Sequence, residues 1–301
     1  YETAYTNKRY ELIYAMWKNK AITELYEPGS TFKVMTAAMA LEEAVVKLND
    51  TFTCGGGNFS GRLTAPLCFA GALCMQMLEE KDIHIGAHIS SIGKTDDERF
   101  NAVTVCKNDF ESILSKPFPV ICDKKGELMQ KEIYDAKANG DSVGGTIECA
   151  IVGMPAGIGE PIFDGIENRI SMAVFGIPAV KGIEFGAGFE SARMLGSENN
   201  DDFIAENGRI STVTNNHGGI LGGISSGMPI VFRCAIKPTP SIGIEQNSVN
   251  AEPLEAEKLV IGGRHDPCIV PRARIVLDSV AALVIADMLT VRYGSDALTR
   301  K

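Results

Sequence analysis

The chain changes character within residues 55–65, which read Gly55-Gly56-Gly57-Asn58-Phe59-Ser60-Gly61-Arg62-Leu63-Thr64-Ala65. The leading glycines form a flexible joint, because glycine has no side chain to restrict the backbone. Thr64 then opens a predicted helix that runs to Leu78, with Pro66 in its first turn, where the missing N–H of proline costs nothing. Arg62 stands at this loop-to-helix junction, where a guanidinium and free backbone N–H groups together suit a phosphate or a carboxylate.

C-terminal to this stretch, strand-like and helix-like patterns follow one another. Alternating apolar residues predict strands at residues 83–89, 146–152, 180–185 and 230–236. Strands interspersed with helices indicate an α/β or α+β core. The other expectations are a helix over 124–139 that ends at Gly140, an irregular segment over 110–120, and a helix over 272–288 that begins at Pro271 and buries Ile275, Val276, Val280, Leu283 and Val284.

Glycine is dense between residues 140 and 227. Such density predicts tight turns and places where the backbone approaches a ligand closely. Within Gly218–Gly223, four glycines in six residues could let the backbone lie flat against a planar ring or a phosphate. Lys237, Thr239 and Ser241 add a cation and two hydroxyls at alternate positions, which face one side if the segment is extended.

The first 54 residues have a different pattern, with apolar positions at helical spacing over 12–18 and 31–48. Ser30 and Lys33 lie three apart on the second of these predicted helices, so the lysine could activate the serine hydroxyl as a nucleophile. The segment around them, Asn19-Lys20-Ala21-Ile22 and Glu27-Pro28-Gly29-Ser30-Thr31-Phe32-Lys33, resembles the penicillin-binding transpeptidases.

The transpeptidase resemblance ends near Thr53 and lacks the rest of that family's site. Its Lys-Thr-Gly strand has no full counterpart, because Lys94-Thr95 is followed by Asp96. A Ser-x-Asn element, Ser197-Glu198-Asn199, falls in a stretch that the second resemblance explains better. We therefore expect residues 1–54 to be a transpeptidase-like helical fragment without catalysis, with Ser30 and Lys33 as the catalytic pair only in the alternative interpretation.

From Gly55 to the C-terminus the chain resembles chorismate synthase. The resemblance implies an α/β (α+β) fold of the β-α-β sandwich type, incomplete, with a helical N-terminal extension. Residues 55–301 would then form the C-terminal portion of such an enzyme. The segments that carry the resemblance are residues 55–65, Gly140-Asp141-Ser142-Val143-Gly144-Gly145, Met154-Pro155-Ala156-Gly157-Ile158-Gly159-Glu160-Pro161-Ile162-Phe163-Asp164, Pro178-Ala179-Val180-Lys181-Gly182, Gly218-Gly219-Ile220-Leu221-Gly222-Gly223-Ile224-Ser225, Lys237-Pro238-Thr239-Pro240-Ser241 and Gly263-Arg264-His265-Asp266-Pro267-Cys268.

This resemblance implies a lyase of the shikimate pathway of aromatic amino acid biosynthesis. Its reaction is the 1,4-elimination of phosphate from 5-enolpyruvylshikimate 3-phosphate to chorismate, with reduced FMN and no net redox change. Asp266 is the candidate for proton handling, and Arg62 for anion contact in catalysis. The residues implied to line the FMN site are Asn58, Phe59, Ser60, Pro178, Ala179, Gly222, Lys237, Pro238, Thr239, Pro240, Ser241 and Arg264.

Plainer interpretations compete with these assignments. Arg264 and Asp266 could be a simple ion pair, and glycine-rich turns are commonly only turns. The four histidines, His84, His88, His217 and His265, are each interpreted as structural or solvent-exposed. The Gly-Glu-Ser-His and Arg-Pro-x-His-Ala-Asp segments of the family, which carry its general-acid histidines, do not occur in the 301 residues. Loss of a general acid costs roughly 10²–10⁴-fold, so we expect little or no synthase activity from this chain.

Composition narrows the remaining choices. A net charge of −9 argues against nucleic-acid binding, and no apolar run approaches the roughly 20 residues of a membrane span. Eight cysteines without a CxxC pair indicate a reducing cytoplasm, with no metal site and no disulfide scaffold. The family implies a homo-oligomer, a tetramer. The sequence begins at Tyr1 without a Met, and its N-terminal segment has no signal-peptide pattern. Both features are expected of a fragment or an internal start.

Three hypotheses remain open from the sequence: an FMN-dependent lyase fused at its N-terminus, a cell-wall serine transpeptidase, and an inactive chimeric fragment. Both families can run into a Gly-Gly at residues 55–57, with Thr51–Cys54 suiting the transpeptidase and Gly57–Ser60 the synthase. A junction at shared residues is what recombination, or a mistaken joining of two sequences, would produce.

Overall fold

A computed structural model describes residues 61–298, except 207, 252–253 and 264. The chain divides into two compact units, residues 1–69 and 70–301. The described part of the first unit consists of the 3-10 helix η1 (Gly61–Thr64) and the start of helix α4 (Ala65–Glu79). The predicted helix from Thr64 to Leu78 is thereby confirmed, whereas the predicted helices over 12–18 and 31–48 lie outside the described residues.

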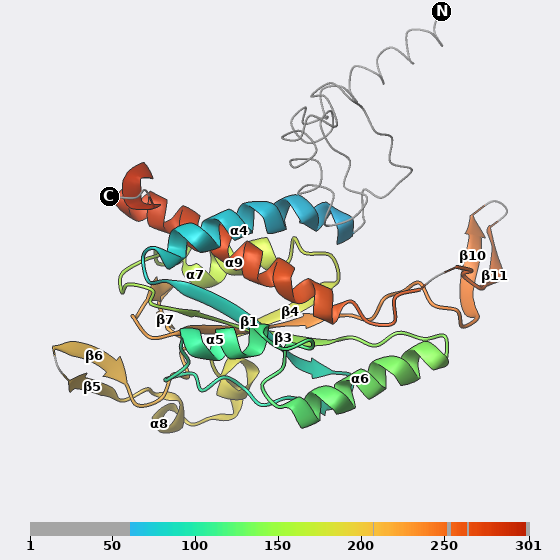
Figure 1. Cartoon of the computed structure of the whole chain (residues 1–301), viewed down its shortest axis with the longest axis horizontal. Helices are drawn as coiled ribbons and strands as arrows, with labels where there is room; N and C mark the ends of the chain where they lie inside the picture. The colour runs from blue at the N-terminus through green and yellow to red at the C-terminus, as the bar shows by residue number, and fades with distance from the viewer. Residues whose placement is uncertain (1–60, 207, 252–253, 264, 299–301) are drawn as a thin grey trace, which may run out of the picture. The chain divides into compact units, whose positions relative to one another are not determined.

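The second unit is built on a five-stranded antiparallel sheet of order β2-β1-β3-β9-β4 (Figure 1). Its strands are β1 (His84–Ile92), β2 (Thr95–Asp96), β3 (Gly145–Val152), β4 (Val180–Phe185) and β9 (Ile230–Ile236). All neighbouring pairs run antiparallel. The four strands predicted from alternating residues are confirmed, although β1, β3 and β9 are buried along nearly their whole length and not only at every second position.

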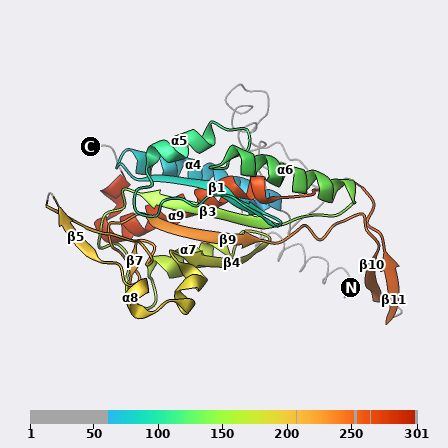
Figure 2. The same ribbon diagram turned by 90° about the horizontal axis from the view of Figure 1, so that it is seen from below.

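Helices cover both faces of this sheet, as Figures 1 and 2 show. Helices α9 (Val270–Tyr293) and α7 (Ile166–Val174) lie on one face together with α4. Helices α5 (Lys107–Leu114) and α6 (Asp123–Ala138) lie on the other. This arrangement is the expected mixed α/β fold, and its sheet is antiparallel.

The remaining elements are short and were not anticipated. They are the 3-10 helices η2 (Gly188–Arg193) and η3 (Ser295–Leu298), helix α8 (Gly196–Asn199), and the hairpins β5 (Phe203–Glu206) with β6 (Arg209–Thr212), β7 (Ile220–Leu221) with β8 (Ile224–Ser225), and β10 (Gln246–Ala251) with β11 (Leu254–Leu259). The β5–β6 and β10–β11 hairpins project from opposite ends of the sheet in Figure 2.

Helix α5 corrects the expectation that residues 110–120 are irregular. Its start is fixed by Asp109, whose carboxylate accepts a hydrogen bond from Cys106 N at 2.8 Å. Phe110 and Ile113 are buried in a core cluster with residues of β3 and β9. The two prolines of the segment follow the helix end, so the proline-rich half is irregular and the first half is helical.

Helix α9 extends beyond the predicted 272–288 at both ends and is buried on almost every side. The prediction that Ile275 is buried is wrong, because its side chain is 42% exposed. Three residues outside the predicted buried stripe, Ala273, Leu277 and Ala281, are buried. The helix contacts β1, β3 and α7, so residues around most of its circumference are covered. A helix that is apolar on all sides has no single hydrophobic stripe from which its buried face could be predicted.

An ion pair is buried between α9 and the sheet. Arg274 donates to Asp278 Oδ2 at 2.6 Å and to the carbonyl of Ala87 at 3.4 Å. Burial raises the pKa of Asp278 to about 6, although the Arg274 guanidinium opposes the rise. Helix α4 crosses the same helix closely, since a Cβ on Gly71 would lie 2.4 Å from the Cβ of Ser279.

Candidate functional site

Segments distant in sequence converge on the loop that follows β9, residues 237–241. The backbone N–H of Lys237 donates to the carbonyl of Ala179 at 2.9 Å, which joins this loop to the Pro178–Ala179 turn before β4. Ser142 Oγ donates to the carbonyl of Thr239 at 2.6 Å. The structure therefore brings together three of the glycine- and proline-rich segments singled out in the sequence.

Two backbone features hold this arrangement in place. Ala179 adopts a φ of +74°, a left-handed conformation that costs an alanine about 1–2 kcal/mol. Such strain persists only where the surrounding structure imposes it, and it is frequent at functional sites. Gly144 passes so close to the loop that a Cβ there would lie 2.4 Å from the Ile236 carbonyl oxygen and 3.0 Å from Pro238, so only glycine fits.

The loop presents two polar side chains, Lys237 and Thr239, without a partner among the described residues. Thr239 Oγ1 is buried and has no hydrogen-bond partner among the described residues. Lys237 forms no ion pair with any carboxylate in the described part of the chain. A buried hydroxyl without a partner is unfavourable by about 1–3 kcal/mol, so a group that bound here would recover that loss.

Ser241 and Asp266 lie beside the loop with partners of their own. Ser241 Oγ is 3.1 Å from His265 Nδ1, and His265 Nε2 is 2.7 Å from the carbonyl of Ile261. Asp266 forms an ion pair with Arg272 of α9 and accepts a hydrogen bond from Cys268 N at 3.3 Å. The cationic partner that the structure gives Asp266 is therefore Arg272, and the suggested partner Arg264 is outside the described residues.

Gly222 is not part of this cluster. It lies in the turn between β7 and β8, near the start of β9, whereas Lys237 follows the end of that strand. The seven residues of β9 span roughly 23 Å at about 3.3 Å per residue, so the two positions lie at opposite ends of the strand. The structure separates Gly222 from the other described candidates.

Backbone packing accounts for the other glycines of the Gly218–Gly223 stretch. A Cβ at Gly218 would lie 2.4 Å from Gly186 N, one at Gly219 2.4 Å from the Pro229 oxygen, and one at Gly223 2.5 Å from the Glu160 oxygen. Only Gly222 has nothing within 4 Å. Close chain packing therefore explains the need for glycine at three of the four positions, and the expectation that this backbone lies flat against a ligand stays a prediction.

Several candidates cannot be placed. The backbone of Arg62 lies in η1, but its side chain is not among those that the structure describes. The other candidates outside the described residues are Asn58, Phe59, Ser60 and Arg264, together with the alternative pair Ser30 and Lys33.

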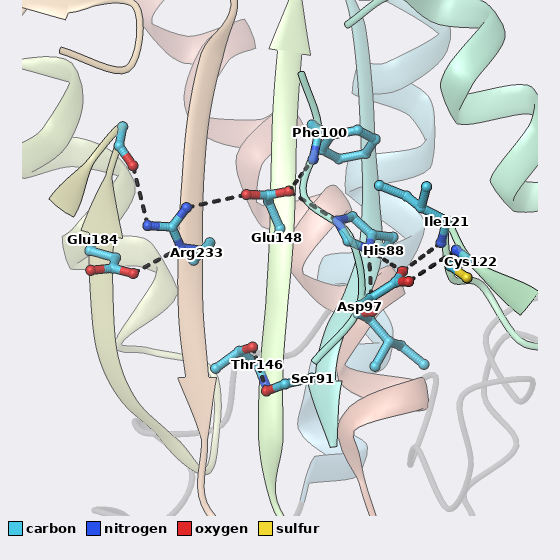
Figure 3. Close-up of polar contacts among 12 residues, drawn as sticks. His88, Ser91, Asp97, Phe100, Ile121, Cys122, Thr146, Glu148, Glu184 and Arg233 are labelled. Carbon is cyan, nitrogen blue, oxygen red and sulfur yellow. Dashed lines mark hydrogen bonds and ion pairs between the residues drawn. The ribbon is translucent and has the colours of Figure 1, made fainter. Parts of the chain in front are cut away.

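A second polar cluster crosses the sheet and was missed from the sequence. His88, Glu148, Arg233 and Glu184 occupy one row of paired residues on β1, β3, β9 and β4, so their charges alternate across four strands (Figure 3). His88 Nε2 is 3.0 Å from Glu148 Oε2, and Arg233 donates to Glu148 Oε1 at 3.3 Å and to Glu184 Oε1 at 2.8 Å. We call these four residues and Asp97 the His88 network.

Asp97 completes the network on the far side of the histidine. Its Oδ2 lies 3.2 Å from His88 Nδ1, and its carboxylate accepts hydrogen bonds from the backbone N–H groups of Ile121 and Cys122 at 2.6 and 2.9 Å (Figure 3). Because both ring nitrogens face a carboxylate that can only accept, the geometry favours the doubly protonated imidazolium. His88 therefore fastens the segment before α6 to the sheet.

The pKa shifts agree with this proton assignment. Burial alone would lower the pKa of His88, but hydrogen bonds to Asp97 and Glu148 outweigh it, and the pKa is raised. Burial tends to raise the pKa of Glu148, yet the hydrogen bond from His88 and the charge of Arg233 hold it below its usual value. The pKa of Asp97 is likewise lowered, against the effect of burial, by its hydrogen bonds to His88 and to backbone N–H groups.

An open cavity of about 490 Å³ adjoins the network and is lined in part by Ser90, Arg99 and Phe189. Each nitrogen of the Arg233 guanidinium at its edge already donates within the protein, Nε to Glu184, Nη1 to Glu148 and Nη2 to the Gly186 carbonyl. Every nitrogen and oxygen atom of these charged side chains thus has at least one partner within the protein. A signal for the network did exist in the sequence: His88, Glu148 and Arg233 each lie near the middle of a mostly apolar strand, β1, β3 and β9 respectively.

The family model for chorismate synthase matches residues 34–290. The chain belongs to the chorismate synthase family. A second family model, the penicillin binding protein transpeptidase domain, matches residues 2–65, so the two matches overlap at the glycine-rich junction. Both resemblances noted in the sequence are thereby confirmed.

Curated relatives give the same family. The chain is 46% identical to chorismate synthase of Lancefieldella parvula over 245 residues, which cover 78% of this chain and 64% of the relative. It is 44% identical to chorismate synthase of Thermococcus gammatolerans over 247 residues, covering 82% of this chain and 67% of the relative. The chain thus spans about two thirds of the length of these relatives.

A solved structure supports the fold. A crystal structure of chorismate synthase matches with a TM-score of 0.67 at 31% sequence identity, covering 79% of this chain and 66% of that one. Among the helices that the structure describes, none has both the length and the apolar character needed to cross a membrane.

Proposed function

We propose that this chain carries the C-terminal part of a chorismate synthase site. The reaction is the elimination of phosphate from 5-enolpyruvylshikimate 3-phosphate with reduced FMN as cofactor. The observation that carries the proposal is the convergence of the 178–179, 237–241 and 265–266 segments at one end of the sheet. These segments also carry the family resemblance.

The residues of the 237–241 loop fit a flavin mononucleotide. Lys237 offers a cation not engaged with a described carboxylate, and Thr239 offers a buried hydroxyl without a partner. An anionic and hydrogen-bonding ligand would satisfy both groups. Pro178, Ala179, Pro238 and Pro240 would shape the apolar wall beside it, while Asn58, Phe59, Ser60, Gly222 and Arg264 remain proposed contacts on the sequence resemblance alone.

When bound, reduced FMN supplies transient electron density to the breaking allylic C–O bond and recovers it, so the elimination needs no net redox change. The chain's own residues bind, orient and handle protons. Lys237 would neutralise an anionic oxygen, and Arg62 would contact a phosphate or carboxylate at the start of α4. The Asp266 carboxylate would accept or return a proton, and its ion pair with Arg272 stabilises the ionised form that can accept.

The substrate is proposed to be a small anionic molecule, and the assembly a homotetramer as in the family. The boundary between residues 1–54 and 55–301 remains a prediction, as does the cytoplasmic location. Turnover by this chain is expected to be low, because the two histidine-bearing segments of the family do not occur in its 301 residues.

Titration of the purified 301-residue chain with FMN tests the flavin site, with quenching of flavin fluorescence as the readout. Lys237→Met should weaken binding by roughly 10–100-fold, as expected for a charge-assisted hydrogen bond of about 1.5–3 kcal/mol. Lys125→Met, which changes an exposed lysine of α6, is the matched control and should bind as the parent chain does. Equal loss in both variants, or no quenching at all, would reject the site.

Chorismate formation tests the reaction itself. The Lancefieldella parvula relative serves as the positive control under anaerobic reduced-flavin conditions. We expect flavin binding with little or no turnover by this chain. Turnover equal to that of the relative would contradict the expected role of the missing histidines.

The transpeptidase match to residues 2–65 favours a second candidate function, acyl transfer through Ser30 activated by Lys33. A fluorescent β-lactam distinguishes the two candidates, because a functional transpeptidase serine would be labelled covalently. We expect no labelling. Labelling that disappears in Ser30→Ala would establish the second function.

A further inference from the structure

A short hydrogen-bonded chain connects the backbone to the candidate flavin loop. His265 Nε2 lies 2.7 Å from the carbonyl oxygen of Ile261, and His265 Nδ1 lies 3.1 Å from Ser241 Oγ. All three residues are partly buried. The ring is therefore held at both nitrogens, one by the backbone and one by a residue of the loop.

Proton accounting fixes the direction of both bonds. A carbonyl oxygen can only accept, so Nε2 must carry the proton. In the neutral ring Nδ1 then has a lone pair and accepts the hydroxyl proton of Ser241. No carboxylate of the described residues pairs with His265, and its neighbour Asp266 is engaged by Arg272.

We infer that His265 is a positioning residue that accepts the hydroxyl proton of Ser241 in a hydrogen bond. The Ser241 oxygen can then only accept a hydrogen bond from a bound ligand. Ser241 then cannot donate to a phosphate oxygen. It requires an N–H or O–H donor on the ligand, such as a flavin ring N–H or a ribityl hydroxyl. This assignment to a flavin rests on the proposed function.

The loop is thereby divided into two kinds of recognition. Lys237 and Thr239 have donors that the described residues do not use, and these suit an anionic or carbonyl oxygen. Ser241, two residues further along, offers only an acceptor. A ligand that satisfies the whole loop must therefore carry both oxygen acceptors and a hydrogen-bond donor, as FMN does.

Nitrogen-15 NMR of the flavin-free chain tests the tautomer of His265 directly. The sequence has only four histidines, and the His265 signals can be assigned by their loss in His265→Asn. We expect the Nε2–H tautomer at pH 7.5. The Nδ1–H tautomer, or a doubly protonated ring, would overturn the inference.

Flavin titrations with FMN and with riboflavin, which lacks the phosphate, test which part of the ligand Ser241 contacts. Ser241→Ala should weaken both flavins by the same factor, roughly fivefold for one neutral hydrogen bond. A loss confined to FMN would mean that Ser241 contacts the phosphate and would overturn the inference.

Two substitutions of the histidine separate positioning from packing. His265→Asn places an amide oxygen near the Nδ1 position, where it can still accept from Ser241, and should bind both flavins within about twofold of the parent chain. His265→Leu removes the acceptor and should match Ser241→Ala. Equal losses in both histidine variants would show that His265 acts only through packing, contrary to the inference.

The two readouts keep this inference apart from the proposed function. If neither flavin binds while the Nε2–H tautomer is present, the flavin site is wrong and the assignment of the Ser241 proton stands. If FMN binds tightly but the tautomer is the other one, the flavin site stands and the inference is wrong.

Discussion

The His88 network and the 237–241 loop both contain charged and hydroxyl side chains, but they differ in what satisfies them. In the network, every oxygen of Asp97, Glu148 and Glu184 and every nitrogen of Arg233 has a partner within the protein. In the loop, Thr239 Oγ1 has none among the described residues. A closed network contributes to stability, whereas an open set of donors is what a ligand site requires.

The largest expected effect comes from opening the closed network. Glu148→Ala removes the acceptor shared by His88, Arg233 and the backbone N–H of Phe100, and it takes from each of the two buried cations one of its two carboxylate partners. We expect a loss of about 3–5 kcal/mol in the free energy of unfolding, measured by urea denaturation. Glu127→Ala, at an exposed position of α6, should change it by no more than about 0.5 kcal/mol. A loss below about 1 kcal/mol for Glu148→Ala would mean that the network contributes little.

The next effect concerns the backbone that supports the loop. In Gly144→Ala the new methyl group would meet the Ile236 oxygen and Pro238, so the loop must shift. We expect a stability loss of about 1–3 kcal/mol, typical of overpacking, together with weaker FMN binding. Gly196→Ala is the matched control, because nothing lies within 4 Å of its added Cβ. Unchanged FMN affinity in Gly144→Ala would separate the 140–145 segment from the site.

Protonation of His88 gives the network a pH dependence. Because its pKa is raised in the folded chain, the folded state binds more protons, and stability present below about pH 6.5 is lost as the pH rises through the folded-state pKa. The slope for one proton cannot exceed about 1.4 kcal/mol per pH unit. Unfolding free energies should be compared between the parent chain and His88→Gln from pH 6.5 upward, because Asp278, with its pKa raised to about 6, causes a similar loss at lower pH. Parallel curves for the two chains would contradict the proton assignment.

The smallest effects compare two threonines. Thr239→Val removes a buried hydroxyl without a described partner, so the flavin-free chain should gain about 1–3 kcal/mol of stability while FMN binding weakens roughly fivefold. Thr146→Val removes a hydroxyl that lies 2.7 Å from Ser91 Oγ on the sheet, and it should cost about 1 kcal/mol of stability without affecting FMN. Calorimetric unfolding measures the stability of both variants, and flavin titration measures their affinity for FMN. An exchange of these outcomes would reverse the contrast between the two regions.

The sequence was informative where a local pattern sufficed. Strands β3, β4 and β9 follow from alternation, and α6 ends where Gly140 adopts a φ of +69°. Helix α5 differs from the expected irregular segment because Pro117 and Pro119 follow its end and do not interrupt its hydrogen bonds. The candidate loop was found through its motif, but motifs alone could not reveal that Gly222 lies at the other end of β9.

By itself, the sequence determined the family, the main strands and the residue types of the candidate site, because these depend on motifs and on periods of a few residues. Only the tertiary structure decided which polar groups are satisfied. His88, Asp97, Glu148, Arg233 and Glu184 lie far apart in the chain and meet through strand register and one loop. Ser241 gains its proton acceptor from a histidine 24 residues away. Hydrogen bonding is short-ranged and directional, so the state of a polar group depends on neighbours that folding alone brings within 3 Å.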